Sequence, residues 1–292
     1  CMSNWVIGVI GGSGLYEIDG LEGAKEIQVE TPWGAPSDSL VKGYVGDVAF
    51  VFLPRHGKGH RLSPTTVPYR ANIDALKRLG CTDVLSVSAC GSLQEQYAPG
   101  QFVMVDQFID RTFAREKSFF GPGMVAHVSI ADPICARLSQ LAGDAAEAAG
   151  AAVHRGGTYL AMEGPQFSSR AESHLYRQWG CDVIGMTNMP EAKLAREAEL
   201  PYATIAMVTD YDCWREDEAA VEVTNVLEIM AANTAKAKTT ISKLAEQLQG
   251  VARTPSPQGI ETCLDYAMIT SPEARDPAML AKLDVVAGRV LR

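Results

Sequence analysis

The sequence has little that would suit it to nucleic acid, to a membrane or to export. Its formal net charge is −9 with a pI of about 5.1, and no basic run exceeds a few residues, which makes DNA, RNA and anionic lipid poor partners. No apolar stretch reaches the length of a membrane span. The opening CMSNW lacks the charged and apolar regions of a signal peptide. We therefore expect no nucleic acid, no membrane and a cytoplasmic location.

Cysteine is present, but not in the patterns that bind zinc or build a disulfide framework. The seven cysteines include no CxxC, and their odd number is typical of reduced thiols. His56 and His60 have the spacing of a metal pair, but Gly57 and Gly59 between them disfavour a helix and no third ligand is evident. We expect no metal, and we interpret Cys213, beside the acids of TDYDC, as a packing residue.

Two nucleotide-binding motifs are also missing from the loop that follows the first apolar run, IGVIGGSGLY. A dinucleotide fingerprint would need glycine where Glu17 stands, and the Gly-Lys-Ser/Thr of a Walker loop is absent. What remains is a loop of backbone N–H groups with one hydroxyl, Ser13, which suits a single small anion. The alternative is a tight turn that only lets two elements pack.

The 292 residues, 47% hydrophobic and 21% charged, show alternating strand and helix patterns. Strands are predicted at 5–10, 40–45, 48–54, 83–89, 101–110, 152–162, 181–186 and 201–210. Helices are predicted at 65–79, 132–150 (capped by Asp132), 168–180, 190–200 and 217–249. This alternation predicts an α/β fold, a central mixed sheet flanked by helices. We expect one domain, 1–292, with a core over about 5–250 and a surface-wrapping C-terminal tail, 251–292, of uncertain role.

Several loops that follow apolar strands carry side chains suited to an anion or a base. Ligands of α/β sheets bind where loops leave the carboxyl ends of strands. The residues in those positions are Ser13, Arg55, His56, Ser88, Ala89, Met186, Thr187, Thr209, Asp210 and Asp212. Two cationic side chains and three hydroxyls can surround one phosphate with charge-assisted hydrogen bonds. The sequence therefore predicts a small-anion site at this edge of the sheet.

Seven collinear stretches within residues 5–250 read IGGSGLY, TPWGAPSD, LPRHGKGH, VPYRANIDALKRLGCTDVLSVSACGSL, GQFVMVDQFIDRT, EGPQFSSRAES and DVIGMTNMPEAKLAREAELPYATIAMVTDYDCW. Together they resemble the trimeric purine nucleoside phosphorylase family, in its methylthioadenosine phosphorylase branch. The resemblance implies that family's fold and a homotrimer. It implies phosphate ligands at Ser13, Arg55, His56, Ser88, the backbone of Ala89, and Thr187. Ser13 and Ser88 stand where relatives often have threonine, which keeps the hydroxyl.

The resemblance also implies how a nucleoside is held. The implied contacts are Met186 with the ribose, Phe167 with the purine, Asp210 and Asp212 with the base edge, His127 from a neighbouring subunit, and Val223, Val226 and Leu227 around the 5′ group. An apolar wall suits a methylthio group, although these three residues on one helix face are open to interpretation as core. Glu163, in MEGPQF, is expected to hold its loop.

The implied reaction is phosphate-dependent cleavage of the N-glycosidic bond of 5′-methylthioadenosine. It gives adenine and 5-methylthioribose 1-phosphate, a step of purine and methionine salvage. Such a pentosyltransferase needs no cofactor, because inorganic phosphate is the co-substrate and nucleophile. Asp210 is the candidate catalytic donor of a proton to purine N7, for which burial and Asp212 would have to raise its pKa.

Two alternatives stay open. A phosphorylase of 6-oxopurine nucleosides or methylthioinosine would carry out the same chemistry on a different base. An Asp pair offers adenine one donor for N7 and one acceptor for N6–H, whereas a 6-oxopurine presents acceptors at both O6 and N7. The alternative outside enzymes is a non-catalytic nucleoside or phosphate binding protein on the same scaffold.

Overall fold

The computed structural model describes residues 4–216 and 223–292, with side chains in the second range from 226 onward. Within these residues eleven strands form one mixed sheet. The strands are β1 (Val6–Gly11), β2 (Glu22–Ile27), β3 (Leu40–Val45), β4 (Val48–Pro54), β5 (Asp83–Ser92), β6 (Phe102–Met104), β7 (Gln107–Asp110), β8 (Val153–Arg155), β9 (Thr158–Ala161), β10 (Val183–Gly185) and β11 (Tyr202–Asp210). The predicted α/β fold with a mixed central sheet is confirmed.

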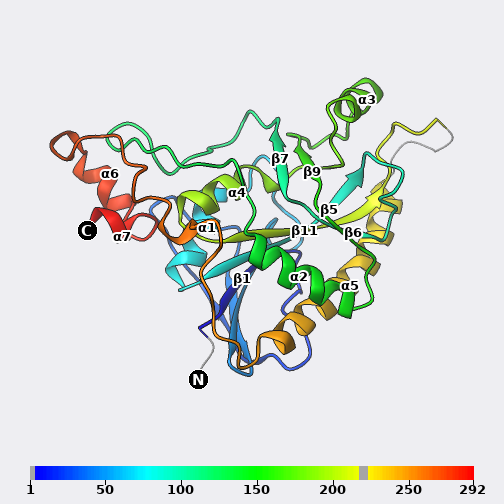
Figure 1. Cartoon of the computed structure of the whole chain (residues 1–292), viewed down its shortest axis with the longest axis horizontal. Helices are drawn as coiled ribbons and strands as arrows, with labels where there is room; N and C mark the ends of the chain where they lie inside the picture. The colour runs from blue at the N-terminus through cyan, green and yellow to red at the C-terminus, as the bar shows by residue number, and fades with distance from the viewer. Residues whose placement is uncertain (1–3, 217–222) are drawn as a thin grey trace.

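Helices cover both faces of this sheet, and a group of short helices follows near the C-terminus (Figure 1). The helices are α1 (Tyr69–Arg78), α2 (Ala136–Ala148), α3 (Arg170–Gln178), α4 (Asn188–Glu197), α5 (Val223–Leu248), α6 (Pro277–Lys282) and α7 (Gly288–Leu291), with 3₁₀ turns at Ile260–Thr262 and Pro272–Ala274. Helices α2 and α5 pack against one another and on β11, while α1 packs against α4. No helix in the described ranges is both long and apolar enough to cross a membrane.

The sheet branches at its central strand, β5, which pairs with three other strands. Strands β1, β4, β5 and β11 run parallel, so their carboxyl ends lie at one edge. The first part of β5 pairs with β1, most of its length pairs with β11, and its last residues pair antiparallel with β10. The sheet therefore forks at β5. The loops after β1, β4, β10 and β11 surround this fork, as expected for a binding site in an α/β sheet.

The C-terminal residues after 250 return to the core. The indole of Trp5 donates to the carbonyl of Val251 at 3.0 Å, and Arg253 Nε is 2.7 Å from Asp83 Oδ2 at the start of β5. The tail also adds fully buried side chains to the main core, including Ile260, Leu264, Leu283, Val286 and Ala287. The segment around Met268 then bridges to Ala126. In Figure 1 it forms, with the 113–130 loop, the lobe at the left.

Two predicted helix starts are wrong. The helix predicted from 65 begins at Tyr69, since Pro68 disfavours helical backbone in the residue before it. The helix predicted from Asp132 begins at Ala136, and its N-cap is Cys135 instead. Ile134 and Cys135 are buried, and the Cys135 N–H donates to the carbonyl of Tyr202. Because these contacts with the core hold the segment in a non-helical path, the helix does not begin after Asp132.

Three strand predictions also differ from the structure. Strand β2 was not expected, because five of the six residues of this edge strand are exposed and it has no apolar pattern. The predicted strand 152–162 is two strands, separated at Gly156 and Gly157, which both have positive φ. The predicted strand 101–110 is also two, β6 and β7. The predicted start of the long helix, 217–222, lies outside the described residues.

Candidate active site

Hydrogen bonds connect the loops that carry the predicted phosphate ligands. The Arg55 N–H donates to the carbonyl of Gly11 at 2.9 Å, which places the loop after β4 beside the glycine loop. Ser13 Oγ then donates to the carbonyl of Gly57 at 3.4 Å. A Cβ added to Gly12 would meet no described atom within 4 Å. The loop therefore leaves open space above its backbone.

Arg55 is buried, with 3% of its side chain exposed, and is held from three sides. Its Nε and Nη2 form a bidentate ion pair with Glu191 at 2.8 and 3.0 Å. Nη2 also donates to Ser86 Oγ at 2.6 Å, and Nη1 donates to the carbonyl of Val87 at 3.1 Å. Burial opposes the charged guanidinium, but Glu191 outweighs it and raises the pKa of Arg55. Nη1 has a second proton besides the one given to Val87.

His56 is neutral in this environment. Burial lowers its pKa to about 4, and the charge of neighbouring Arg55 acts in the same direction. Its Nδ1 lies 2.9 Å from the carbonyl oxygen of Leu62, which can only accept, so Nδ1 carries the proton and Nε2 presents a lone pair. The His60 ring stacks on it with centroids 4.1 Å apart. His56 therefore presents an acceptor, not a positive charge.

Ser88 and Thr187 are brought to the same place from different strands. Ser88 is buried within β5, directly after the residue whose carbonyl Arg55 contacts, and lies 3.4 Å from Asn188 Oδ1. Thr187 precedes Asn188 and is the N-cap of α4. Its backbone N–H donates to the Tyr159 hydroxyl at 3.4 Å. Ala89 follows Ser88 in β5. The structure thus joins the Ser13, Arg55, Ser88 and Thr187 segments around one point of the sheet.

The two acids lie on the neighbouring strand, with Asp210 at the end of β11 and Asp212 two residues beyond it. Asp210 pairs with Gly91 of β5, and a Cβ on Gly91 would come within 3.0 Å of Asp210 Oδ1. Asp210 accepts from Thr209 Oγ1 and from the Asp212 N–H, both at 2.7 Å. Asp212 has a positive φ of 55°. Burial, and to a smaller extent the charge of Asp210, raises the pKa of Asp212.

Phe167 and Met186 flank this arrangement. Phe167 is 43% exposed, and the segment after it reaches the acids, since Cys213 Sγ lies 3.4 Å from the carbonyl of Ser168. Met186 lies half-buried after β10, beside Thr187. An exposed aromatic ring and a thioether suit contact with a flat base and a sugar.

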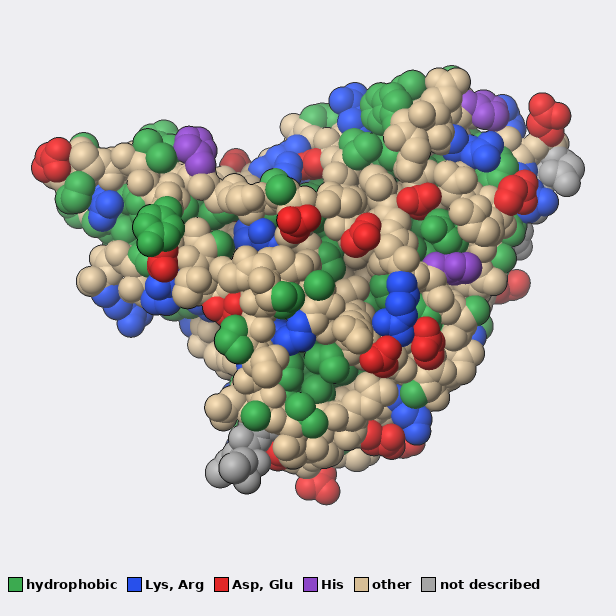
Figure 2. All heavy atoms as spheres, in the orientation of Figure 1, with side chains coloured by type: hydrophobic (Ala, Val, Ile, Leu, Met, Phe, Trp, Pro, Cys, Tyr) green, Lys and Arg blue, Asp and Glu red, His purple; other side chains and the backbone are tan. Residues whose placement is uncertain are grey.

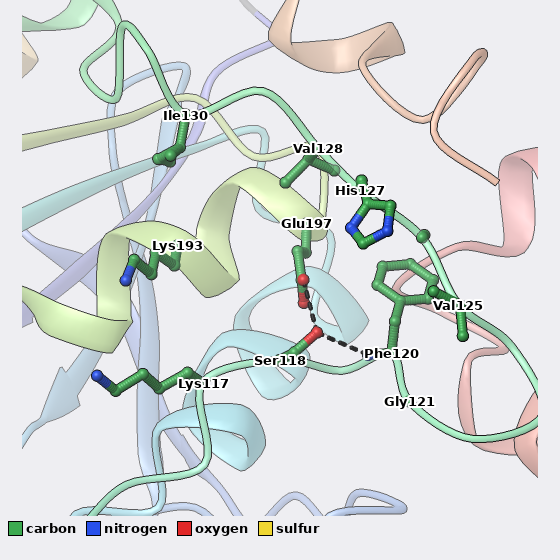
Figure 3. Close-up of a pocket in the computed structure, with 11 residues that line it drawn as sticks. Lys117, Ser118, Phe120, Gly121, Val125, His127, Val128, Ile130, Lys193 and Glu197 are labelled. Carbon is green, nitrogen blue, oxygen red and sulfur yellow. Dashed lines mark hydrogen bonds between the residues drawn. The ribbon is translucent and has the colours of Figure 1, made fainter. Parts of the chain in front are cut away.

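His127 is not brought to these residues by its own chain. It is exposed and lines a different pocket, of about 380 Å³, together with Lys117, Phe120, Lys193 and Glu197. Figure 3 shows the imidazole at one side of this pocket, with Glu197 of α4 to its left and Phe120 below it. Burial raises the pKa of Glu197 to about 7, although Ser118 Oγ and the Phe119 N–H donate to its carboxylate. None of the predicted phosphate ligands lines this pocket.

The predicted 5′ wall lies in the first turns of α5. Val226 is half-buried, and Leu227 is 61% exposed, so the alternative that Leu227 belongs to the core is wrong. The side chain of Val223 lies outside the described residues. The Asn233 amide, two turns later, donates to the carbonyl of Val208 at 3.1 Å and so ties α5 to the end of β11.

Two residues that organise the site gave no usable sequence signal. Glu191 looks like an ordinary acid in the first turn of a helix, and Arg115 lies in a charged loop, FAREKS. In the fold, Glu191 neutralises Arg55, and Arg115 forms a buried ion pair with Glu163 at 2.7 Å. The partners are 136 and 48 residues apart, so sequence spacing could not have paired them.

On the face drawn in Figure 2, cationic and anionic side chains alternate and do not gather in a single basic patch.

A family model described as the phosphorylase superfamily matches residues 6–246. The S-methyl-5′-thioadenosine phosphorylase of Cereibacter sphaeroides is 62% identical, over 98% of this chain and 99% of its own. The protein of that name from Bradyrhizobium diazoefficiens is 57% identical over the whole of both chains.

Solved structures agree with these relatives. A methylthioadenosine phosphorylase from an antarctic soil metagenomic library superposes with a TM-score of 0.91 at 45% identity, over 97% of this chain and 99% of that one. A methylthioadenosine phosphorylase from Schistosoma mansoni in complex with adenine superposes with a TM-score of 0.81 at 41% identity, over 88% and 95%. The chain therefore belongs to the phosphorylase superfamily, in its methylthioadenosine phosphorylase family, which confirms the resemblance seen in the sequence.

Proposed function

We propose that this protein is a pentosyltransferase that uses inorganic phosphate to cleave 5′-methylthioadenosine. The products are adenine and 5-methylthioribose 1-phosphate. The observation that carries the proposal is the set of contacts Ser13–Gly57, Arg55–Val87 and Ser88–Asn188, which brings the hydroxyl-bearing segments of the chain together with the segment of the buried Arg55. The names of the relatives support the same reaction. No cofactor is proposed, because phosphate is the co-substrate.

In the proposed mechanism, the loops bearing Ser13, Arg55 and Thr187 hold orthophosphate beneath C1′ of the sugar. The neutral His56 accepts, at Nε2, a hydrogen bond that a protonated oxygen of phosphate donates. A phosphate oxygen bonds to C1′ as the C1′–N9 bond breaks, and the electron pair of that bond passes to the purine. Positioning of two reactants in this way contributes roughly 7–11 kcal/mol in favourable cases.

Asp210 and Asp212 recognise the purine and select adenine as the leaving base. Asp210 and Asp212 together offer one proton to N7 and one carboxylate to N6–H of adenine, with Asp210 as the donor that the sequence suggests. Phe167 lies against the purine and Met186 against the ribose. Val223, Val226 and Leu227 receive the methylthio group. A 6-oxopurine would leave a buried acceptor unpaired, which costs about 1–3 kcal/mol.

The proposed assembly is a cytoplasmic homotrimer in which His127 reaches a neighbour's site. It is supported by exposed apolar side chains near His127, namely Val125, Ile269 and Tyr266, which is 98% exposed. The Ile269 N–H donates to the carbonyl of Val125, so these groups belong to one lobe. Free thiols at the six described cysteines suit a reducing compartment. Light scattering of the purified protein tests the trimer.

The reaction is tested with purified protein and methylthioadenosine, with and without phosphate. Adenine release that requires phosphate is expected, together with a lower kcat/KM for inosine and methylthioinosine. Saturable binding of methylthioadenosine without turnover would favour the binding-protein alternative. A higher kcat/KM for the 6-oxopurine nucleosides would favour the other phosphorylase.

A further inference from the structure

The carboxylate of Glu163, in the loop after β9, joins two other segments of the chain, 113–115 and the one that carries Thr65. Its Oε1 accepts from the backbone N–H groups of Phe113 and Ala114, both at 2.8 Å. Its Oε2 accepts from Thr65 Oγ1 at 2.5 Å and from Arg115 Nε at 2.7 Å. Burial acts to raise the pKa of Glu163, but these bonds outweigh it and lower the pKa to about 2. Glu163 therefore organises its neighbours as a carboxylate and does not act as an acid.

The Arg115 side chain, which has no exposed surface, connects this carboxylate to the turn after β10. Its Nη1 donates to the carbonyl oxygens of Met186 and Met189, the second at 2.7 Å. Its Nη2 donates to the carbonyl of Glu163 at 2.9 Å. Thr187 lies between those two methionines. One guanidinium thus fixes the backbone on both sides of a proposed phosphate ligand.

Two loops of the proposed site share this anchor. Loop 163–167 carries Phe167, and turn 186–189 carries Met186 and Thr187. The loops are also in contact, because a Cβ added to Gly164 would overlap the sulfur of Met186. A buried carbonyl that loses its donor is costly, so the turn is not expected to keep this path without Arg115.

We propose that Arg115, acting with Glu163, is a positioning residue for phosphorolysis. The proposal rests on the function proposed above. Neither side chain touches the substrate or exchanges a proton with it. Their role is to hold Thr187 where it meets phosphate and Met186 where it meets the ribose. Displacement of reacting groups by about 1 Å can cost about 10²-fold in rate.

The test compares Arg115→Met with Arg155→Met. Arg155 is the control, since it too forms carboxylate ion pairs, in its case with Asp144 and Glu147, but it lies in β8. R115M is expected to lower kcat/KM about 100-fold and to raise the KM for phosphate about tenfold, with R155M within about twofold of wild type. Arg115→Lys should restore little of the kcat/KM that R115M loses, because one ammonium cannot replace the several directed N–H groups of the planar guanidinium. A folded R115M with kcat and both KM values within about threefold of wild type would overturn the proposal.

Two further measurements keep the outcome decisive. Phosphate alone is expected to raise the Tm of wild type and R155M, and not that of R115M. If wild type releases no adenine, the proposed function fails, but a phosphate-induced rise in Tm that R115M has lost still supports the positioning role of Arg115. If phosphate raises the Tm of R115M as it does that of wild type, the positioning role fails. If R115M does not fold, Thr65→Val removes one donor to Glu163 and is expected to lower kcat/KM about fivefold. Unchanged constants in T65V would overturn the role.

Discussion

The guanidinium of Arg55 makes a bidentate ion pair with Glu191, with Nε 2.8 Å from Oε2 and Nη2 3.0 Å from Oε1. Both side chains are almost wholly buried, at 3% and 2% exposure. Tyr202 also donates its hydroxyl proton to Glu191 at 2.8 Å. Arg55 is therefore oriented by helix α4, whose N-cap is the proposed phosphate ligand Thr187.

Removing the charge of Glu191 should destabilise the protein strongly. Glu191→Gln keeps the side-chain shape but leaves Arg55 as a buried charge without its counter-ion, which costs about 3–5 kcal/mol. Urea denaturation at a fixed protein concentration measures the change in the free energy of unfolding. Asp144→Asn, in an exposed ion pair with Arg155, is the control and should cost under about 1 kcal/mol. Equal effects of the two variants would contradict this account.

His56 should make the folded state less stable in acid. Its folded pKa of about 4 lies below the ordinary value of about 6.5, so between these values the unfolded chain binds more protons. The stabilisation is complete above about pH 6.5 and is lost as the pH falls toward about 4. His56→Gln should flatten the dependence of unfolding free energy on pH in this window, by up to about 1.4 kcal/mol per pH unit. Parallel curves for variant and wild type would show that His56 is not held neutral.

Glu197 should act with the opposite sign. Burial raises its folded pKa to about 7 from 4.5, so the folded state binds the extra proton and stability declines as the pH rises through this range. Glu197→Gln removes the penalty of ionisation, because its amide can accept from the Phe119 N–H and donate to Ser118 Oγ. The variant should match wild type in unfolding free energy near pH 4.5 and exceed it by up to about 3 kcal/mol near pH ~8. A variant that is less stable at every pH would argue against this.

The two acids should be separable by substitution. Asp210→Asn is expected to lower kcat for methylthioadenosine by about 10²–10⁴, the usual contribution of a general acid. Asp212→Asn should cost less, about 5–150-fold in kcat/KM, and should improve the relative kcat/KM of methylthioinosine. Steady-state kinetics on both nucleosides measure the change. If Asp212→Asn gives the larger loss in kcat, the proton comes from Asp212, whose pKa burial raises.

The apolar strands and glycine stops could be predicted from the sequence because their signals are local. The strands predicted at 40–45 and 48–54 and the predicted end of the first helix at 79 agree with the structure to within one residue, and Gly46 and Gly80, which follow the first strand and that helix, have positive φ. Strand β2 could not be predicted, since an exposed edge strand buries almost nothing and leaves no pattern. Helix α2 starts later than the cap predicted at Asp132, because burial of Ile134 and Cys135 in the core stabilises the fold more than a further helical turn would.

The sequence by itself determined the chemistry available at the site, because hydroxyls, a guanidinium and paired acids follow apolar strands whatever the packing. Only the tertiary structure decided which of them act together. Arg55 depends on Glu191, and turn 186–189 depends on Arg115 and Glu163, through bonds between residues far apart in the chain. Such pairings form when burial removes water from the partners, and burial is a property of the whole fold and not of a local sequence pattern.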